Sequence, residues 1–236
     1  MSSTTLRVAV WAVLSLPTFA ASIYTVSGTN GNSNPVSAEA DFGFANNQLF
    51  VSLTNTLADP AAANQLLTGI TFTFTGGTYA NNVGSVTNLT GTTRNITSST
   101  NWTDTPINTS TANWTATNTG STFNLFFNGA TYSIIGDPGP GPKYDSNSSI
   151  VANNGHNPFL AGTPVFTLSV PGVTSTSNLS GVTFFFGTGR EFSIAGVPCT
   201  SNCGGGGESV TPEPVSYLLA GTGLIGIYFL RRRRAS

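Results

Sequence analysis

Acidic side chains are the residues of this chain whose spacing first suggests chemistry. Glu39 and Asp41 stand two residues apart, which places both carboxylates on one face of a strand, and Asp137 and Asp145 bracket a loop rich in backbone carbonyls. Hard cations such as Ca²⁺ bind several oxygen ligands of this kind. No EF-hand or repeat-type acidic spacing is present, so the four residues are weak calcium candidates, and solvated carboxylates are the simpler expectation.

The two cysteines are a second candidate. Cys199 and Cys203 are separated by three residues and precede a run of four glycines. Two thiols are too few for a structural metal site, and a catalytic redox pair is more often Cys-x-x-Cys at a helix start. We therefore expect a small local disulfide, formed in an oxidising compartment.

A catalytic set is not visible in the sequence. His156 is the only histidine, and no nucleophile or acid can be assigned to it. We expect a protein that is not an enzyme and needs no cofactor, with a hydrolase of envelope polysaccharides based on His156 as the lesser alternative. Trp102 and Trp114 could stack on sugar rings or lie buried, so a carbohydrate-binding, lectin-like module is the main alternative.

The C-terminal residues form a three-part signal. Pro212, Glu213 and Pro214 resist continuation of any helix or strand. Residues 215–230 carry no charge, and as a helix they would reach ~24 Å, close to the ~30 Å hydrocarbon core of a bilayer. Basic residues stop translocation and stay in the cytoplasm. The sequence thus predicts a transmembrane helix over 215–230, followed by a stop-transfer cluster made of Arg231, Arg232, Arg233 and Arg234.

This tail resembles the bacterial PEP-CTERM sorting domain. The resemblance lies in Pro212-Glu213-Pro214, the apolar segment with its glycines, and the terminal arginines. It implies that an exosortase-like membrane enzyme processes the chain near the Pro-Glu-Pro sequence. It also implies a Gram-negative envelope and, in many such organisms, extracellular polysaccharide as a partner.

The N-terminus agrees with export. Arg7 precedes a short apolar stretch, Val8 to Leu16, and small residues lead to Ala20, as a signal peptidase requires. We expect residues 1–20 to be a signal peptide handled by the Sec translocon and signal peptidase. Type I topology follows: a precursor in the inner membrane, and later a location at the cell surface, in the outer membrane or in the extracellular matrix.

Charge in the exported part is sparse. Three basic and eight acidic residues between positions 21 and 211 give a formal charge of minus five. So few Lys and Arg residues cannot form the basic surface that nucleic acid requires, and we exclude nucleic acid as a partner.

Strand patterns dominate the exported part. Apolar residues alternate with Ser, Thr and Asn in several segments, which is typical of half-solvated antiparallel strands. Turn-forming Gly and Asn residues separate them. The pattern predicts an all-β fold, a two-sheet antiparallel β-sandwich that is jelly-roll-like, with strands in 23–27, 38–44, 49–54, 70–75, 83–89, 123–127, 131–135, 165–170, 182–186 and 191–195.

The remaining segments complete the expected organisation. Asp59 to Leu67 reads as a short helical connector with Asp59 as its N-cap, and 90–121 reads as long strands or loops. The proline-rich stretch 137–142 must be an exposed loop, since proline cannot donate to a ladder. We expect four parts: 1–20, the signal peptide; 21–198, the exported domain; 199–211, a Cys/Gly-rich linker; and 212–236, the sorting signal.

Overall fold

The computed structural model describes residues 21–110, 113–144, 149–151 and 155–200. The chain divides into two compact units, and every described residue belongs to the first, which ends at Thr200. The predicted signal peptide and the predicted sorting signal lie outside the described residues. Within the described part no helix is long and apolar enough to cross a membrane. The helix predicted over 215–230 therefore stays a prediction.

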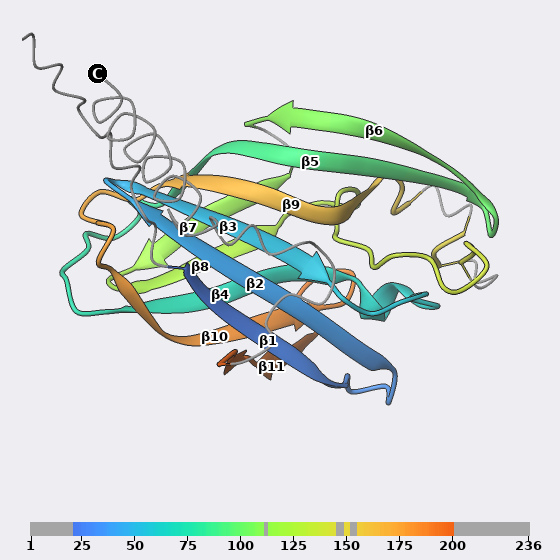
Figure 1. Ribbon diagram of the computed structural model, residues 1–236, viewed down its shortest axis with the longest axis horizontal. Helices are drawn as coiled ribbons and strands as arrows, with labels where there is room; N and C mark the ends of the chain where they lie inside the picture. Colours follow the sequence, from blue (N-terminus) through green and yellow to red (C-terminus); the bar gives the residue numbers. More distant parts are fainter. Residues whose placement is uncertain (1–20, 111–112, 145–148, 152–154, 201–236) are drawn as a thin grey trace, which may run out of the picture. The chain divides into compact units, whose positions relative to one another are not determined.

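The first unit consists of two antiparallel sheets (Figure 1). The seven-stranded sheet has the order β12 (Val197–Pro198), β1 (Ala21–Thr29), β2 (Pro35–Ala45), β3 (Gln48–Asn55), β9 (Phe159–Ser169), β5 (Ser85–Ser98) and β6 (Asn101–Thr109). The five-stranded sheet has the order β11 (Phe192–Ala195), β10 (Asn178–Phe186), β4 (Leu67–Thr75), β8 (Thr122–Phe127) and β7 (Trp114–Thr119). The predicted all-β, two-sheet antiparallel architecture is confirmed. Its strand order differs from the paired Greek keys of a jelly roll, because β1, β2 and β3 follow one another as a meander.

Alternation along the strands creates the main core between the sheets. On β2 every second side chain is buried, so Phe42 and Phe44 point inward while Glu39 and Asp41 do not. Phe42 meets Phe72 of β4 at 5.2 Å between ring centroids, edge to face. Aromatic contacts of this kind add about 0.5–1.5 kcal/mol each to the area that they bury. The phenylalanine-rich core expected from the sequence thus joins the two sheets.

A smaller second core lies beside the first. It is formed by residues from β5, β9 and the loops between strands, namely Ala63, Leu66, Ile96, Ile135, Tyr144, Ile150, Phe159 and Ala161. The predicted strand 131–135 runs between these two cores and is not a strand. Ile134 makes isolated bridges, one to Leu67 and one to Leu160, so the segment touches each of the two neighbouring strands at a single residue and joins no ladder.

The helical prediction for 59–67 is largely wrong. The segment contains one 3₁₀ turn, Ala63–Gln65, whose N-cap is Ala62, and Asp59 has a positive φ of 52°. Gln65 explains the short turn, because its side-chain oxygen accepts hydrogen bonds from the backbone N–H groups of Ala61 and Ala62. The region 90–121 forms strands β5, β6 and β7, and 137–142 is a loop as expected.

Candidate functional site around Arg94

The β5–β6 hairpin places the one buried arginine of the described residues opposite an aspartate. Arg94 on β5 and Asp104 on β6 are direct cross-strand partners. The guanidinium donates from Nε to Asp104 Oδ1 and from Nη2 to Oδ2, each at 2.8 Å. This two-point geometry fixes both side chains, because a planar guanidinium matches a carboxylate edge.

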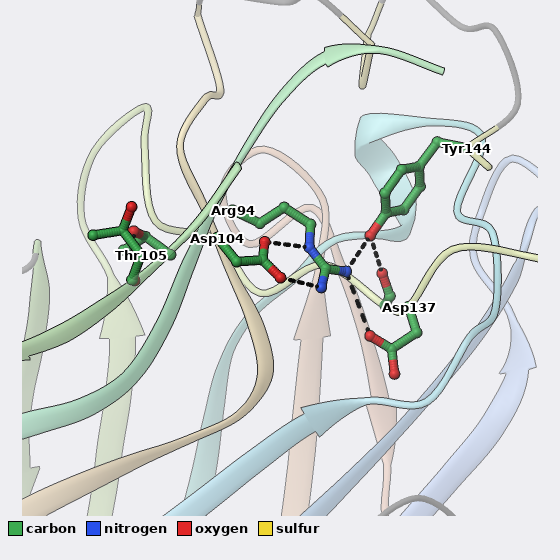
Figure 2. Close-up of polar contacts among 7 residues, drawn as sticks. Arg94, Asp104, Thr105, Asp137 and Tyr144 are labelled. Atoms are coloured by element: carbon green, nitrogen blue, oxygen red, sulfur yellow. Dashed lines mark hydrogen bonds and ion pairs between the residues drawn. The ribbon is translucent and has the colours of Figure 1, made fainter. Parts of the chain in front are cut away.

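A loop from the other side completes the site (Figure 2). Arg94 Nη1 donates to the Tyr144 hydroxyl at 2.8 Å and reaches Asp137 Oδ1 at 3.5 Å. The same hydroxyl donates to the Gly136 carbonyl at 2.9 Å, and the Tyr144 backbone N–H donates to the Ser99 carbonyl at 2.7 Å. Segment 136–144 is therefore fastened to the β5–β6 hairpin.

An aromatic side chain borders the arginine. The Arg94 guanidinium carbon lies 5.5 Å from the Trp102 ring centroid, within the range of a cation–π contact. Trp102 also meets Tyr144 edge to face at 5.6 Å. One charged group thus touches partners from β6 and from the loop at once.

Electrostatics keeps the Arg94 guanidinium charged and the Tyr144 hydroxyl protonated near neutral pH. The hydrogen bonds that Arg94 donates to Asp104 are the largest cause that raises the pKa of Arg94, and burial opposes it. Burial raises the pKa of Tyr144 to about 12, although the nearby Arg94 charge works in the other direction. Neither group is poised to exchange a proton.

Exposure differs sharply across the cluster. The side chain of Arg94 is 11% exposed, whereas those of Asp104 and Asp137 are 39% and 73% exposed. Arg94 donates hydrogen bonds to Asp104 and Tyr144, so the arrangement holds a loop in place. It also presents carboxylates that can only accept hydrogen bonds. We call Arg94, Trp102, Asp104, Asp137 and Tyr144 the Arg94 cluster.

The predicted calcium residues fall in separate places. Glu39 and Asp41 share the outer face of β2, where burial raises the pKa of Asp41. Asp137 lies in the Arg94 cluster, and Asp145 is outside the described residues. Among the described residues no three His, Cys, Asp or Glu side chains come close enough to hold a metal ion, so Asp137 does not join the β2 pair.

The other candidates from the sequence are placed as follows. His156 Nδ1 lies 3.3 Å from the Ala130 carbonyl oxygen in a loop. Trp114 is buried, donates from Nε1 to the Tyr132 carbonyl at 2.9 Å, and packs against Phe166. Trp114 is therefore not available to stack on a sugar ring, and the two tryptophans do not form one exposed platform.

The cysteine prediction is open. The backbone N–H of Cys199 donates to the Ile23 carbonyl at 2.8 Å, which ties the end of the domain to β1. Cys203 lies outside the described residues, so the disulfide stays a prediction.

The Arg94 cluster was missed by sequence reasoning. Arg94 lies four residues before Ser98 and Asp104 three residues after Asn101, and the register shift between Ile96 and Ser98 makes up the difference, so a simple hairpin register would not have paired them. The contact with Tyr144 is long-range in the sequence, and no local pattern indicates it.

Comparisons with known proteins concern the tail. Residues 210–234 match the family model described as the PEP-CTERM protein-sorting motif. A search of curated proteins and a search of solved structures each found no match. The matched range contains the Pro-Glu-Pro sequence and all four arginines that carried the resemblance. The chain therefore contains a PEP-CTERM sorting motif at its C-terminus, and this motif indicates an exported protein that is sorted by way of the membrane and implies processing by an exosortase-type enzyme.

Proposed function

We propose that this chain is a non-enzymatic surface or extracellular-matrix protein. Its β-sandwich is the cargo, and its C-terminal signal delivers that cargo to the cell surface, the outer membrane or the matrix. The PEP-CTERM match at 210–234 is the observation that carries this proposal.

The spacing between domain and signal supports processing of a folded cargo. The first compact unit ends at Thr200, and the Pro-Glu-Pro sequence begins at position 212. The eleven intervening residues include four consecutive glycines, and an extended chain of that length spans roughly 36 Å. A membrane enzyme can thus reach the cleavage region without unfolding β12 or β1.

The surface chemistry of the domain supports a structural role. Solubility comes from Ser, Thr and Asn, and only 7% of the chain is charged. The one buried guanidinium of the described part donates to Asp104 and to Tyr144, and so joins a hairpin to a loop. Its role in the fold is to hold the loop 136–144 against the β5–β6 hairpin.

Cell fractionation tests the proposal. The wild type, a variant with Pro212→Ala, Glu213→Ala and Pro214→Ala, and a matched linker variant, Glu208→Ala, would be expressed in a host that has an exosortase. We expect wild type and Glu208→Ala in the outer-membrane or extracellular fraction, and the triple variant in the inner membrane. If all three share the same inner-membrane location, the sorting proposal is wrong.

A further inference from the structure

An exposed guanidinium lies on the outer face of the five-stranded sheet. Phe126 of β8 and Phe185 of β10 are both opposite Gly69 of β4 on this face, and their rings meet edge to face at 5.0 Å. The guanidinium carbon of Arg190 lies over the Phe126 ring, 4.3 Å from the ring centroid. Stacking on a ring leaves the N–H edge of a guanidinium to a planar acceptor such as a carboxylate.

The acidic neighbour of Arg190 is occupied by its own loop. Glu191 Oε1 accepts from the Thr188 hydroxyl at 2.7 Å, and Glu191 Oε2 accepts from the Gly189 backbone N–H at 3.0 Å. Within the described part of the chain the Arg190 side chain forms no ion pair. The exposed cation is thus held in place by an aromatic ring rather than by a carboxylate.

The outer face of the seven-stranded sheet carries a carboxylate. Asp41 points outward from β2 and is partly buried. It is opposite Ile23 of β1 and Ser52 of β3, and Ser52 is opposite Val165 of β9. Burial raises the pKa of Asp41, because loss of water disfavours the charged form. Among the residues that the structure describes, no cation pairs with Asp41.

These two charges cannot meet within one molecule. The main core lies between the sheets, where Phe42 packs against Phe72, so the two outer faces point in opposite directions. An ion pair between Arg190 and Asp41 would therefore join one copy of the chain to the next. Each copy would keep one free face, and a contact of this heterologous kind repeats without closing.

Apolar side chains accompany the charge on each face. Phe126 and Phe185 surround the guanidinium, while Ile23 and Val165 stand at the two ends of the row that contains Asp41. Arginine and aromatic residues are the types that most often dominate protein interfaces. Apolar neighbours also exclude water, which strengthens an ion pair that forms between them.

We propose that the sandwich stacks head to tail on copies of itself, with Arg190 of one copy paired to Asp41 of the next. The guanidinium face is defined as Phe126, Phe185 and Arg190, and the carboxylate face as Ile23, Asp41 and Val165. Charge complementarity between the two faces selects a second copy as the occupant of each. This inference rests on the proposed function and deepens it, because an open chain of copies is an assembly that a surface or matrix protein would form.

Sedimentation velocity of the purified full-length chain in detergent tests the inference. We expect species larger than a dimer that grow with protein concentration. Because salt screens the ion pair, they should shrink between about 50 mM and about 500 mM NaCl. A monomer at every concentration, or a series that stops at a dimer, overturns the inference.

Variants of single charges locate the contact. Arg190→Gln and Asp41→Asn each remove one charge, and Ser175→Glu and Ser175→Lys make the same two changes in net charge at an exposed loop position between β9 and β10. We expect at least tenfold weaker association for each face variant, no change for either control, and equal melting temperatures. The C-terminal residues are identical in all four, so differences report on the sandwich. Equal association of all four variants, or a loss confined to Arg190→Gln, overturns the pairing.

Mixing the two face variants tests the head-to-tail arrangement. Arg190→Gln keeps the carboxylate face and Asp41→Asn keeps the guanidinium face, so the mixture should give pairs with one copy of each and nothing larger. Absence of mixed pairs contradicts the inference. Because these measurements use purified protein, a failure of sorting in cells leaves them unaffected, and the two failures can be told apart.

Discussion

Arg94 and Tyr144 meet at 2.8 Å between Nη1 and the phenolic oxygen, although fifty residues separate them in the chain. Their contact joins the β5–β6 hairpin to the loop 136–144, and Tyr144 is itself a buried member of the smaller core.

Removal of the guanidinium would release the loop. Arg94→Met keeps an apolar stem but leaves the Asp104 carboxylate and the Tyr144 hydroxyl without their donor. We expect the unfolding free energy to fall by about 2–3 kcal/mol, because Asp104 and Tyr144 lose the hydrogen bonds that the largely buried guanidinium donates to them. Urea denaturation measures this. Arg190→Met, which removes a guanidinium stacked on Phe126, is the control and is expected to cost less than about 1 kcal/mol.

Alkaline pH would weaken the same joint. Burial raises the pKa of Tyr144 from 10.0 to about 12, so the folded chain holds this proton more tightly than the unfolded one. The contribution is fully present below pH 10 and is lost as pH rises towards 12, by roughly 2 kcal/mol. Stability measured between pH 9 and 12 should fall less steeply in Tyr144→Phe. An identical slope in both proteins would contradict this assignment, and the buried Tyr24, whose pKa burial also raises, accounts for a residual slope.

Gly136 leaves no room for a side chain. A Cβ at this position would overlap the Leu57 carbonyl oxygen, and the Gly136 carbonyl also accepts the Tyr144 hydroxyl. We expect Gly136→Ala to lower the unfolding free energy by about 2 kcal/mol through backbone displacement. Gly189→Ala is the control, because its Cβ would meet only ordinary contacts. Equal melting temperatures for the two variants would show that the approach to Leu57 is not tight.

Asn118 anchors a different loop. Its buried amide accepts from the backbone N–H groups of Val83 and Gly84 and donates to the Ala80 and Gly120 carbonyls. We expect Asn118→Ala to cost about 3 kcal/mol, since four backbone groups lose their hydrogen-bond partner, among them the N–H of the buried Gly84. Asn81→Ala removes a single hydrogen bond at an exposed position, and its cost should stay below about 1 kcal/mol. Thermal melts of both variants compare them directly, and equal losses would refute the special role of Asn118.

Local sequence patterns predicted the strands whose alternating side chains face the core. Alternation of Thr and Phe in β4 identified the strand, because each inward side chain needs the same core. The connector at 59–67 was predicted poorly because Asp59 is not its N-cap. The turn forms at Ala63–Gln65 instead, where the Gln65 side chain accepts hydrogen bonds from the backbone N–H groups of Ala61 and Ala62. The strand expected at 131–135 failed because Ile134 bridges Leu67 on one side and Leu160 on the other at single residues, a tertiary placement that no local pattern indicates.

The Arg94 cluster shows the other limit of sequence reasoning. A hairpin with its turn at Ser99 and Thr100 would pair Arg94 with Thr105, and only the register shift between Ile96 and Ser98 brings Asp104 opposite it. Tyr144 and Asp137 arrive through tertiary structure alone. By contrast, the tail was identified from sequence because its signal is a linear order of residues that a membrane enzyme recognises. That recognition matches the family model over 210–234.

Intact-mass spectrometry of the chain recovered from the envelope and the medium tests the central claim most directly. We predict a species that ends near Pro212–Pro214 and lacks Arg231, Arg232, Arg233 and Arg234 in the wild type and in Glu208→Ala. Glu213→Ala should give less of this species. Recovery of surface-located protein with its complete C-terminus, all four arginines included, would contradict processing by an exosortase.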